Sequence, residues 1–97
     1  MAKKLAPIHP GEVLAEDFMA PANLSANQLA LSLRIPANRI TSIIAGKRGI
    51  TADTALRLAR YFGTSAELWM GLQLDYDLQT ERDEHGAEIE RSVLLPA

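Results

Sequence analysis

Helix start and stop signals divide most of this chain into short amphipathic segments, which limits it to a small set of helical architectures. Pro10 suits the first turn of a helix, and Ser25 with Gln28 forms a capping-box pattern at a second helix start. Pro36 and Thr51 begin two further segments, and apolar residues recur at helical spacing within each. The pattern predicts five helices, at about residues 10–20, 26–33, 36–45, 52–62 and 66–84.

The last part of the chain changes its pattern after Gly86. Ala87, Ile89, Val93 and Leu95 would fall on one side of an extended chain, which predicts a short C-terminal strand over about residues 87–95. A length of 97 residues, 47% of them apolar, is enough for one modest core. We therefore expect an all-α, five-helix single domain over residues 1–97, plus this possible strand. We expect an N-terminal arm at about residues 1–8 and a C-terminal dimerisation helix and tail at about 66–97.

The net charge of −2 conceals two halves of opposite sign. Residues 1–63 hold eight Lys and Arg against four Asp and Glu, a net charge of +4. Residues 64–97 hold two Arg against eight acids, a net charge of −6. Within residues 34–60 six bases face a single acid, Asp53. A basic surface for an anionic partner is therefore expected in the middle of the chain, followed by an acidic end.

The two short helices at 26–33 and 36–45 have the organisation of a helix-turn-helix. The second carries small and polar residues on the side opposite Ile40, Ile43 and Ile44, and a basic loop follows it. Such a helix can lie in the major groove, where Asn38 can pair with adenine and Arg39 can reach guanine or a phosphate. The candidate base-reading residues are Ala37, Asn38, Arg39, Thr41 and Ser42. The candidate phosphate-binding residues are Ser25, Gln28, Lys47 and Arg48, the last two through side chains and loop N–H groups.

Periodicity and charge alone leave a second interpretation open. Two helices joined by a short break are common in helical bundles, and a basic helix face is often only solvated. On that interpretation Asn38 is a plain surface residue, and Lys47 with Arg48 forms a solubilising loop.

A longer resemblance favours the DNA-binding interpretation. Residues 25–36 and 40–68 resemble the XRE-type, phage-repressor-like helix-turn-helix family. More narrowly, residues 9–12 (HPGE), 46–59 (GKRGITADTALRLA) and 62–69 (FGTSAELW) resemble the HigA/VapI antitoxins of bacterial toxin–antitoxin modules. The resemblance covers roughly residues 8–80 and implies a dimeric DNA-binding repressor of its own operon, with a partner toxin that is an mRNA-cleaving endoribonuclease.

Two positions depart from the pattern of this family. Gly is usual in the turn after the second helix, where this chain has Arg34, and a left-handed Arg costs about 1 kcal/mol. The turn is therefore open to reshaping. Many relatives also carry a phosphate-binding Gln where this chain has Ala26, so that contact is in doubt and falls to Ser25 or Gln28.

The fifth predicted helix carries two apolar stripes. Leu68, Trp69, Leu72 and Tyr76 form one, as expected of a core stripe, and a second lies on the far side. A single small core cannot bury both, and an exposed apolar stripe marks an interface. A two-fold homodimer is therefore expected, with the tails paired as antiparallel strands. Its candidate interface residues are Met70, Leu74, Leu78, Ile89, Val93 and Leu95. The alternative is that the tail of the same chain, or the toxin, covers the second stripe.

Enzyme chemistry is not expected. The chain has no cysteine, His9 is predicted as a helix cap or surface group, and His85 lacks the spacing of a metal-ligand set. No cofactor or metal is therefore expected. Apolar runs of four residues or fewer predict no membrane span and no membrane partner, and the cytoplasm is the expected location.

The expected function is a sequence-specific DNA-binding antitoxin that neutralises its endoribonuclease toxin and represses its own operon. A solitary XRE-type transcriptional regulator without a toxin is the nearest alternative. A protein-interaction module without DNA binding, using the acidic residues 64–97, is an alternative of another class.

Overall fold

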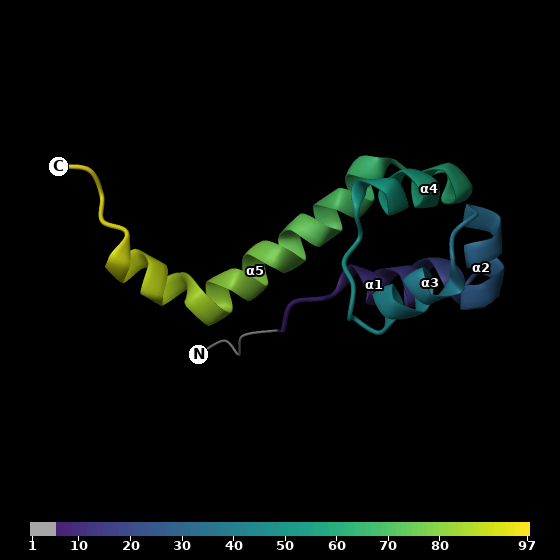
Figure 1. Ribbon diagram of the computed structural model, residues 1–97, viewed down its shortest axis with the longest axis horizontal. Coiled ribbons are helices and arrows are strands. Elements are labelled where there is room, and N and C mark those ends of the chain that lie inside the picture. The colour runs from purple at the N-terminus through teal and green to yellow at the C-terminus, as the bar shows by residue number, and fades with distance from the viewer. Residues whose placement is uncertain (1–5) are drawn as a thin grey trace.

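In the computed structural model, which describes residues 6–97, four short helical segments surround the first part of one long helix (Figure 1). The all-α class and the five predicted helices are confirmed, since α1 and η1 together form the first of them. The elements are α1 (Pro10–Val13), η1 (Leu14–Met19), α2 (Ala26–Leu33), α3 (Ala37–Ile44), α4 (Ala52–Phe62) and α5 (Ala66–Ser92). Among the described residues no helix is both long and apolar enough to cross a bilayer.

Local capping explains where most of these helices begin. Ser25, Thr51 and Ser65 each accept a hydrogen bond from a backbone N–H of the first turn of the helix that follows. His9 does the same for α1, because its Nδ1 accepts from the N–H of Gly11 at 2.9 Å. The prediction of His9 as a helix cap is thus confirmed. η1 is a π-helical segment, with the N–H of Ala20 bonded to the carbonyl of Ala15.

The core lies where α1 to α4 meet the first turns of α5. Trp69 is fully buried at its centre, and its Nε1 donates to Thr64 Oγ1 at 2.9 Å. Leu72 and Tyr76 are half-buried. Leu68 is exposed, so the prediction that it belongs to the core stripe is wrong. The buried apolar residues are Leu14, Met19, Leu29, Ala30, Leu33, Ile40, Ile43, Ile50, Ala55, Leu58 and Trp69.

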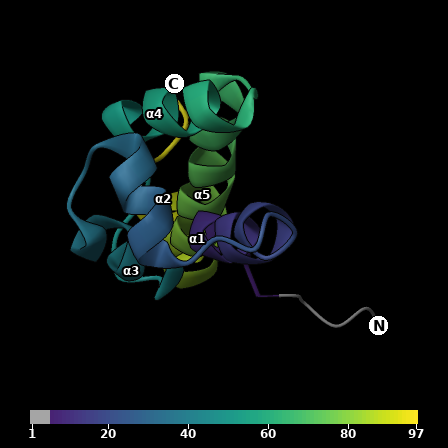
Figure 2. The same cartoon turned by 90° about the vertical axis from the view of Figure 1, so that its right-hand side faces the viewer.

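Gly11 allows α1 to approach α3 at the backbone. A Cβ atom at this position would lie 1.9 Å from the carbonyl oxygen of Ile43, closer than any side chain can be accommodated. Figure 2 shows α1 and α3 close to each other beside α5. The glycine therefore fixes how near α3 lies to α1 and the rest of the bundle.

The predicted C-terminal strand is wrong. α5 continues through Ser92, residues 93–97 have no regular structure, and Gly86 lies inside the helix rather than ending it. Residues 87–92 are mostly good helix formers, and a lone strand would leave its backbone N–H and C=O groups without partners. A helix satisfies them internally, as the bond from the N–H of Val93 to the carbonyl of Ile89 at 2.8 Å illustrates.

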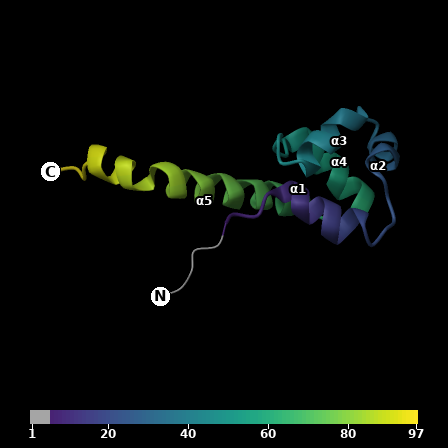
Figure 3. The same ribbon diagram turned by 90° about the horizontal axis from the view of Figure 1, so that it is seen from below.

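The distal part of α5 leaves the bundle. Figures 1 and 3 show it extending away from the other helices and ending in the C-terminal tail, and the molecule is 53 Å long as a result. From residue 81 onward every residue except Gly86 is exposed. This segment makes the molecule elongated and presents a long free helix surface.

Candidate nucleic-acid interface

The helix-turn-helix is formed by α2, a tight turn and α3. Ser25 Oγ accepts from the N–H of Gln28 at 3.1 Å, and Gln28 Oε1 accepts from the N–H of Ser25 at 2.9 Å. These two bonds are the predicted capping box. Both side chains are exposed at the start of α2, and the Gln28 amide nitrogen keeps its donors.

The turn after α2 keeps its usual geometry although Arg34 replaces glycine. Arg34 adopts the left-handed conformation, with φ of 62° and ψ of 43°. The N–H groups of Arg34 and Ile35 donate to the carbonyls of Leu31 and Ala30, which is the Schellman pattern. The turn is therefore not reshaped, and the strain of a left-handed Arg is accommodated.

The outward side of α3 carries the predicted base-reading residues. Asn38 and Thr41 are exposed, Ala37, Arg39 and Ser42 are half-buried, and Ile40 and Ile43 on the opposite side are buried. Thr41 Oγ1 donates to the carbonyl of Asn38 at 3.3 Å, which keeps this hydroxyl close to the helix surface. The face is small and polar, as entry into a DNA groove requires.

The basic loop folds back onto the end of α3. The side chains of Lys47 and Arg48 are exposed, but both of their backbone N–H groups donate to the carbonyl of Ser42, at 2.9 and 3.2 Å. These two N–H groups are therefore engaged within the protein, and phosphate binding by the loop stays a prediction. The two side chains remain available for that role.

Arg39 is bound to α4 rather than free in solvent. Its Nη1 donates to Asp53 Oδ2 at 2.7 Å, and Arg57 Nε donates to the same oxygen at 2.9 Å. Arg57 Nη1 also donates to the carbonyl of Leu33 at 2.8 Å, at the end of α2. The hydrogen bond from Arg57 has the largest effect and that from Arg39 the next largest, and together they lower the pKa of Asp53 below its usual value of 3.8.

Gln73 of α5 holds the other end of the basic loop. Its Oε1 accepts from the N–H of Ile50 at 2.7 Å, and its Nε2 donates to Asp77 Oδ1 at 2.9 Å. A Cβ on Gly49 would lie 3.0 Å from the Gln73 amide, so the loop and this side chain are in close contact. Sequence reasoning missed Gln73 altogether, since no local pattern marks it.

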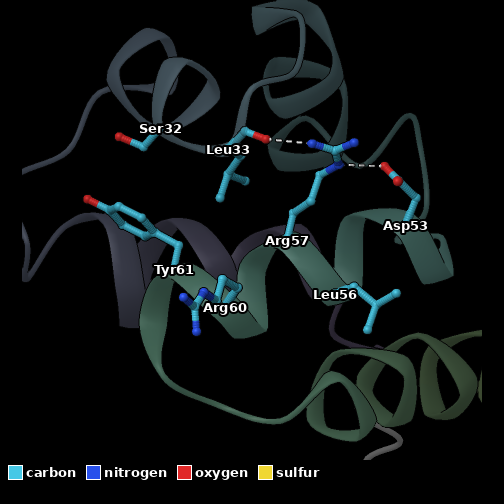
Figure 4. Close-up of a pocket in the computed structure, with 7 residues that line it drawn as sticks. All are labelled: Ser32, Leu33, Asp53, Leu56, Arg57, Arg60 and Tyr61. Carbon is cyan, nitrogen blue, oxygen red and sulfur yellow. Dashed lines mark hydrogen bonds and ion pairs between the residues drawn. The ribbon is translucent and has the colours of Figure 1, made fainter.

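Figure 4 shows a shallow hollow between the end of α2 and α4, lined by Ser32, Leu33, Asp53, Leu56, Arg57, Arg60 and Tyr61. Asp53 and Arg57 in this hollow bond to one another, and Arg57 also bonds to the backbone of α2.

The part of the chain that the structure describes holds no group of three or more acidic, His or Cys side chains suited to a metal ion. His85 is paired with Glu81 at 2.7 Å on α5.

The predicted interface stripe lies exposed along α5. Met70, Leu74 and Leu78 are 39%, 57% and 43% exposed, and Ile89 is 47% exposed. Because α5 is continuous, a rotation of 100° per residue places Ile89 within about 20° of Leu78 on the same face. Val93 and Leu95 lie beyond the end of the helix and are exposed, so the structure does not bring them into this stripe.

Comparison with known proteins gives consistent matches. The helix-turn-helix family model designated HTH_3 matches residues 16–69. Virulence-associated protein I of Dichelobacter nodosus is 49% identical over 83 residues, which are 84% of this chain and 77% of that protein.

Solved structures give the same result over nearly the whole length. An addiction module antidote protein of a HigA family from Coxiella burnetii has 51% identity and a TM-score of 0.89, covering 95% of this chain and 100% of that one. The Pseudomonas aeruginosa antitoxin HigA, solved with the higBA promoter, has 42% identity and a TM-score of 0.90, covering 94% and 99%.

Proposed function

This chain belongs to the HigA family of helix-turn-helix antidote proteins, and we propose that it is an antitoxin that binds its own operator, represses its operon and neutralises a partner toxin. The observation that carries the proposal is the exposed polar face of α3 beside the exposed side chains of Lys47 and Arg48. The relative solved with its promoter supports the DNA-binding part.

Within this proposal the two groups of side chains have different roles. Asn38, Arg39 and Thr41, with Ala37 and Ser42 beside them, face the bases in the major groove. Lys47 and Arg48 bind phosphates through their side chains. Ser25 and Gln28 bind a further phosphate at the start of α2, where the Gln28 amide and the helix N-terminus both favour an anion.

We propose that the DNA-binding form is a homodimer held by α5. The stripe of Met70, Leu74, Leu78 and Ile89 is long, apolar and uncovered in one chain. Packing two such stripes about a two-fold axis buries them and presents two α3 helices to one duplex, about 34–36 Å apart for half-sites one turn apart. The helical form of residues 87–92 means that helix contacts, rather than paired strands, make this dimer.

We propose that the toxin is an mRNA-cleaving endoribonuclease and that acidic residues between Glu67 and Glu90 contribute to its binding. Eight acids and two arginines lie in residues 64–97, and an RNA-cleaving protein is expected to carry a basic surface. Glu84, Glu88 and Glu90 are exposed on the free part of α5.

The DNA part is tested with a duplex that covers the promoter of the gene for this protein. Fluorescence anisotropy should give tighter binding to this duplex than to a scrambled duplex of equal length and composition, with affinity falling as salt rises. Equal binding to both duplexes contradicts an operator-specific function.

The toxin part is tested by co-expression with the adjacent toxin gene. The antitoxin should restore growth, and the triple change Glu84→Lys, Glu88→Lys, Glu90→Lys should weaken the rescue, whereas Glu16→Lys on η1 should not. Full rescue by the triple variant would contradict the acidic surface, and absence of any toxin that it neutralises would favour a solitary regulator.

A further inference from the structure

Asp53 is the single acid among residues 34–60, and it joins three helices. One of its oxygens accepts from Arg39 of α3 at 2.7 Å and from Arg57 of its own helix α4 at 2.9 Å. Arg57 reaches on to the carbonyl of Leu33 at the end of α2, at 2.8 Å. A continuous series of hydrogen bonds therefore runs from the last residue of α2 to the third residue of α3.

This series orients a side chain of the base-reading face. An unrestrained Arg side chain loses rotamer entropy when it binds a base edge in one geometry. Arg39 is already held by its Nη1 and is only 28% exposed, while its Nε and Nη2 keep their N–H donors. Part of the ordering needed for recognition is thus present before DNA arrives.

The charge of Asp53 has the opposite effect on non-specific binding. A carboxylate next to Arg39 and near Arg48, which lines the same small hollow at the start of α4, repels the phosphate backbone. Removing that charge should strengthen binding to any duplex. Removing the Asp53 carboxylate should therefore lower the discrimination that depends on Arg39 and raise the affinity for any duplex. Measuring both quantities separates the two effects.

We propose that Asp53 is a positioning residue that determines operator specificity by holding Arg39 in the orientation that reads DNA. The inference rests on the operator binding proposed above. A merely structural Asp53, joining α2 to α4 through Arg57, would change stability without changing which sequence is preferred.

The first test compares Asp53→Asn with Asp17→Asn, which makes the same change of charge at an exposed position on η1. Binding to the promoter duplex and to the scrambled duplex is measured by fluorescence anisotropy. A good bidentate base contact contributes about 5- to 150-fold to discrimination, so Asp53→Asn should lower the ratio of the two affinities by about 5-fold or more. Binding to the scrambled duplex should rise, and Asp17→Asn should keep the wild-type ratio.

A double-mutant cycle with Arg39→Ala shows whether Asp53 acts through Arg39. In the Arg39→Ala background, Asp53→Asn should leave the affinity ratio unchanged. Asp53→Glu, which retains the charge on a longer side chain, should give a ratio between those of the wild type and Asp53→Asn. An equal loss of discrimination with and without Arg39, or a wild-type ratio in Asp53→Asn, overturns the proposal.

The thermal unfolding of each variant is measured by circular dichroism. If Asp53→Asn is unfolded at the assay temperature, Asp53→Glu and Arg39→Ala decide: the proposal requires a lowered ratio in both, and a wild-type ratio in either overturns it. A wild-type protein that does not distinguish the two duplexes contradicts operator binding itself. If the wild type distinguishes the two duplexes and Asp53→Asn distinguishes them equally well, operator binding stands and only the role of Asp53 is contradicted.

Discussion

Leu74→Glu should separate the proposed dimer into monomers without unfolding the bundle formed by α1 to α4 and the first turns of α5. Leu74 is 57% exposed in the single chain, so more than half of its surface remains to be buried by a partner. Full burial of a leucine is worth about 1.5–3 kcal/mol, and the remaining share is therefore about 1–2 kcal/mol for each of the two copies. A glutamate at the same place also puts a carboxylate into an apolar contact, which adds to the loss.

Together these effects should weaken the dimer by at least about 100-fold in Kd, since 1.4 kcal/mol corresponds to tenfold. Sedimentation equilibrium of wild type and variant at tens of micromolar measures the change directly. Leu31→Glu is the matched control, because Leu31 is 76% exposed on α2, away from the stripe. Far-UV circular dichroism should show the bundle intact in both variants, with any loss of helix in Leu74→Glu limited to the distal part of α5.

Two results would refute the reasoning: a wild-type chain that is monomeric at these concentrations, or a Leu74→Glu variant that stays dimeric. Operator affinity should fall with the dimer, because two α3 helices are needed to contact both half-sites. A monomeric variant with wild-type operator affinity would contradict the two-fold arrangement.

Four further changes test other parts of the structure. Replacing Lys47 and Arg48 by Ala should weaken binding to all duplexes alike and reduce the slope of log K against log salt by about two per protomer; an unchanged slope would remove these side chains from the phosphate contacts. Asn38→Ala should weaken operator binding by about 1–3 kcal/mol of binding free energy and relax the preference at one base pair. An equal loss of binding to scrambled DNA would make Asn38 a backbone contact. The pKa of Asp53, followed by NMR of its carboxyl carbon, should lie below its usual value of 3.8 and rise toward it in Arg57→Gln. Because the folded pKa is the lower one, the contribution of Asp53 to stability is complete above that usual value and is lost as the pH falls through the folded pKa. Gly11→Ala should destabilise the fold by about 1–3 kcal/mol in urea unfolding, because its methyl would meet a backbone carbonyl; wild-type stability would show that α1 can shift.

Local chemistry made most of the fold predictable from the sequence. The capping residues Ser25, Thr51 and Ser65 mark three helix starts in the sequence, and the helices of the structure begin directly after them. The strand prediction was wrong for a non-local reason, because the residues after Gly86 suit both alternation and helical spacing, and only the lack of a pairing strand decides between them.

The candidate interface was predictable only in part. Exposure of Asn38 and Lys47 follows from helix periodicity and charge, both of which can be read along the chain. The bond between Arg39 and Asp53 joins residues 14 positions apart, and that between Ile50 and Gln73 joins residues 23 apart. Such pairs depend on tertiary packing, which no local pattern specifies, although Asp53 as the lone acid in a basic region was a usable signal.

If the α5 stripe pairs as proposed, order in the distal part of α5 depends on the amount of protein present. Isolated helices of this length are marginal in water, and residues 81–92 have almost no buried side chains to hold them. If the stripe pairs as proposed, helix formation at this end and dimerisation are one coupled equilibrium, and dilution unfolds the segment as it separates the chains. Amide hydrogen exchange in residues 81–92 should then slow with rising protein concentration, while exchange in the core around Trp69 stays constant.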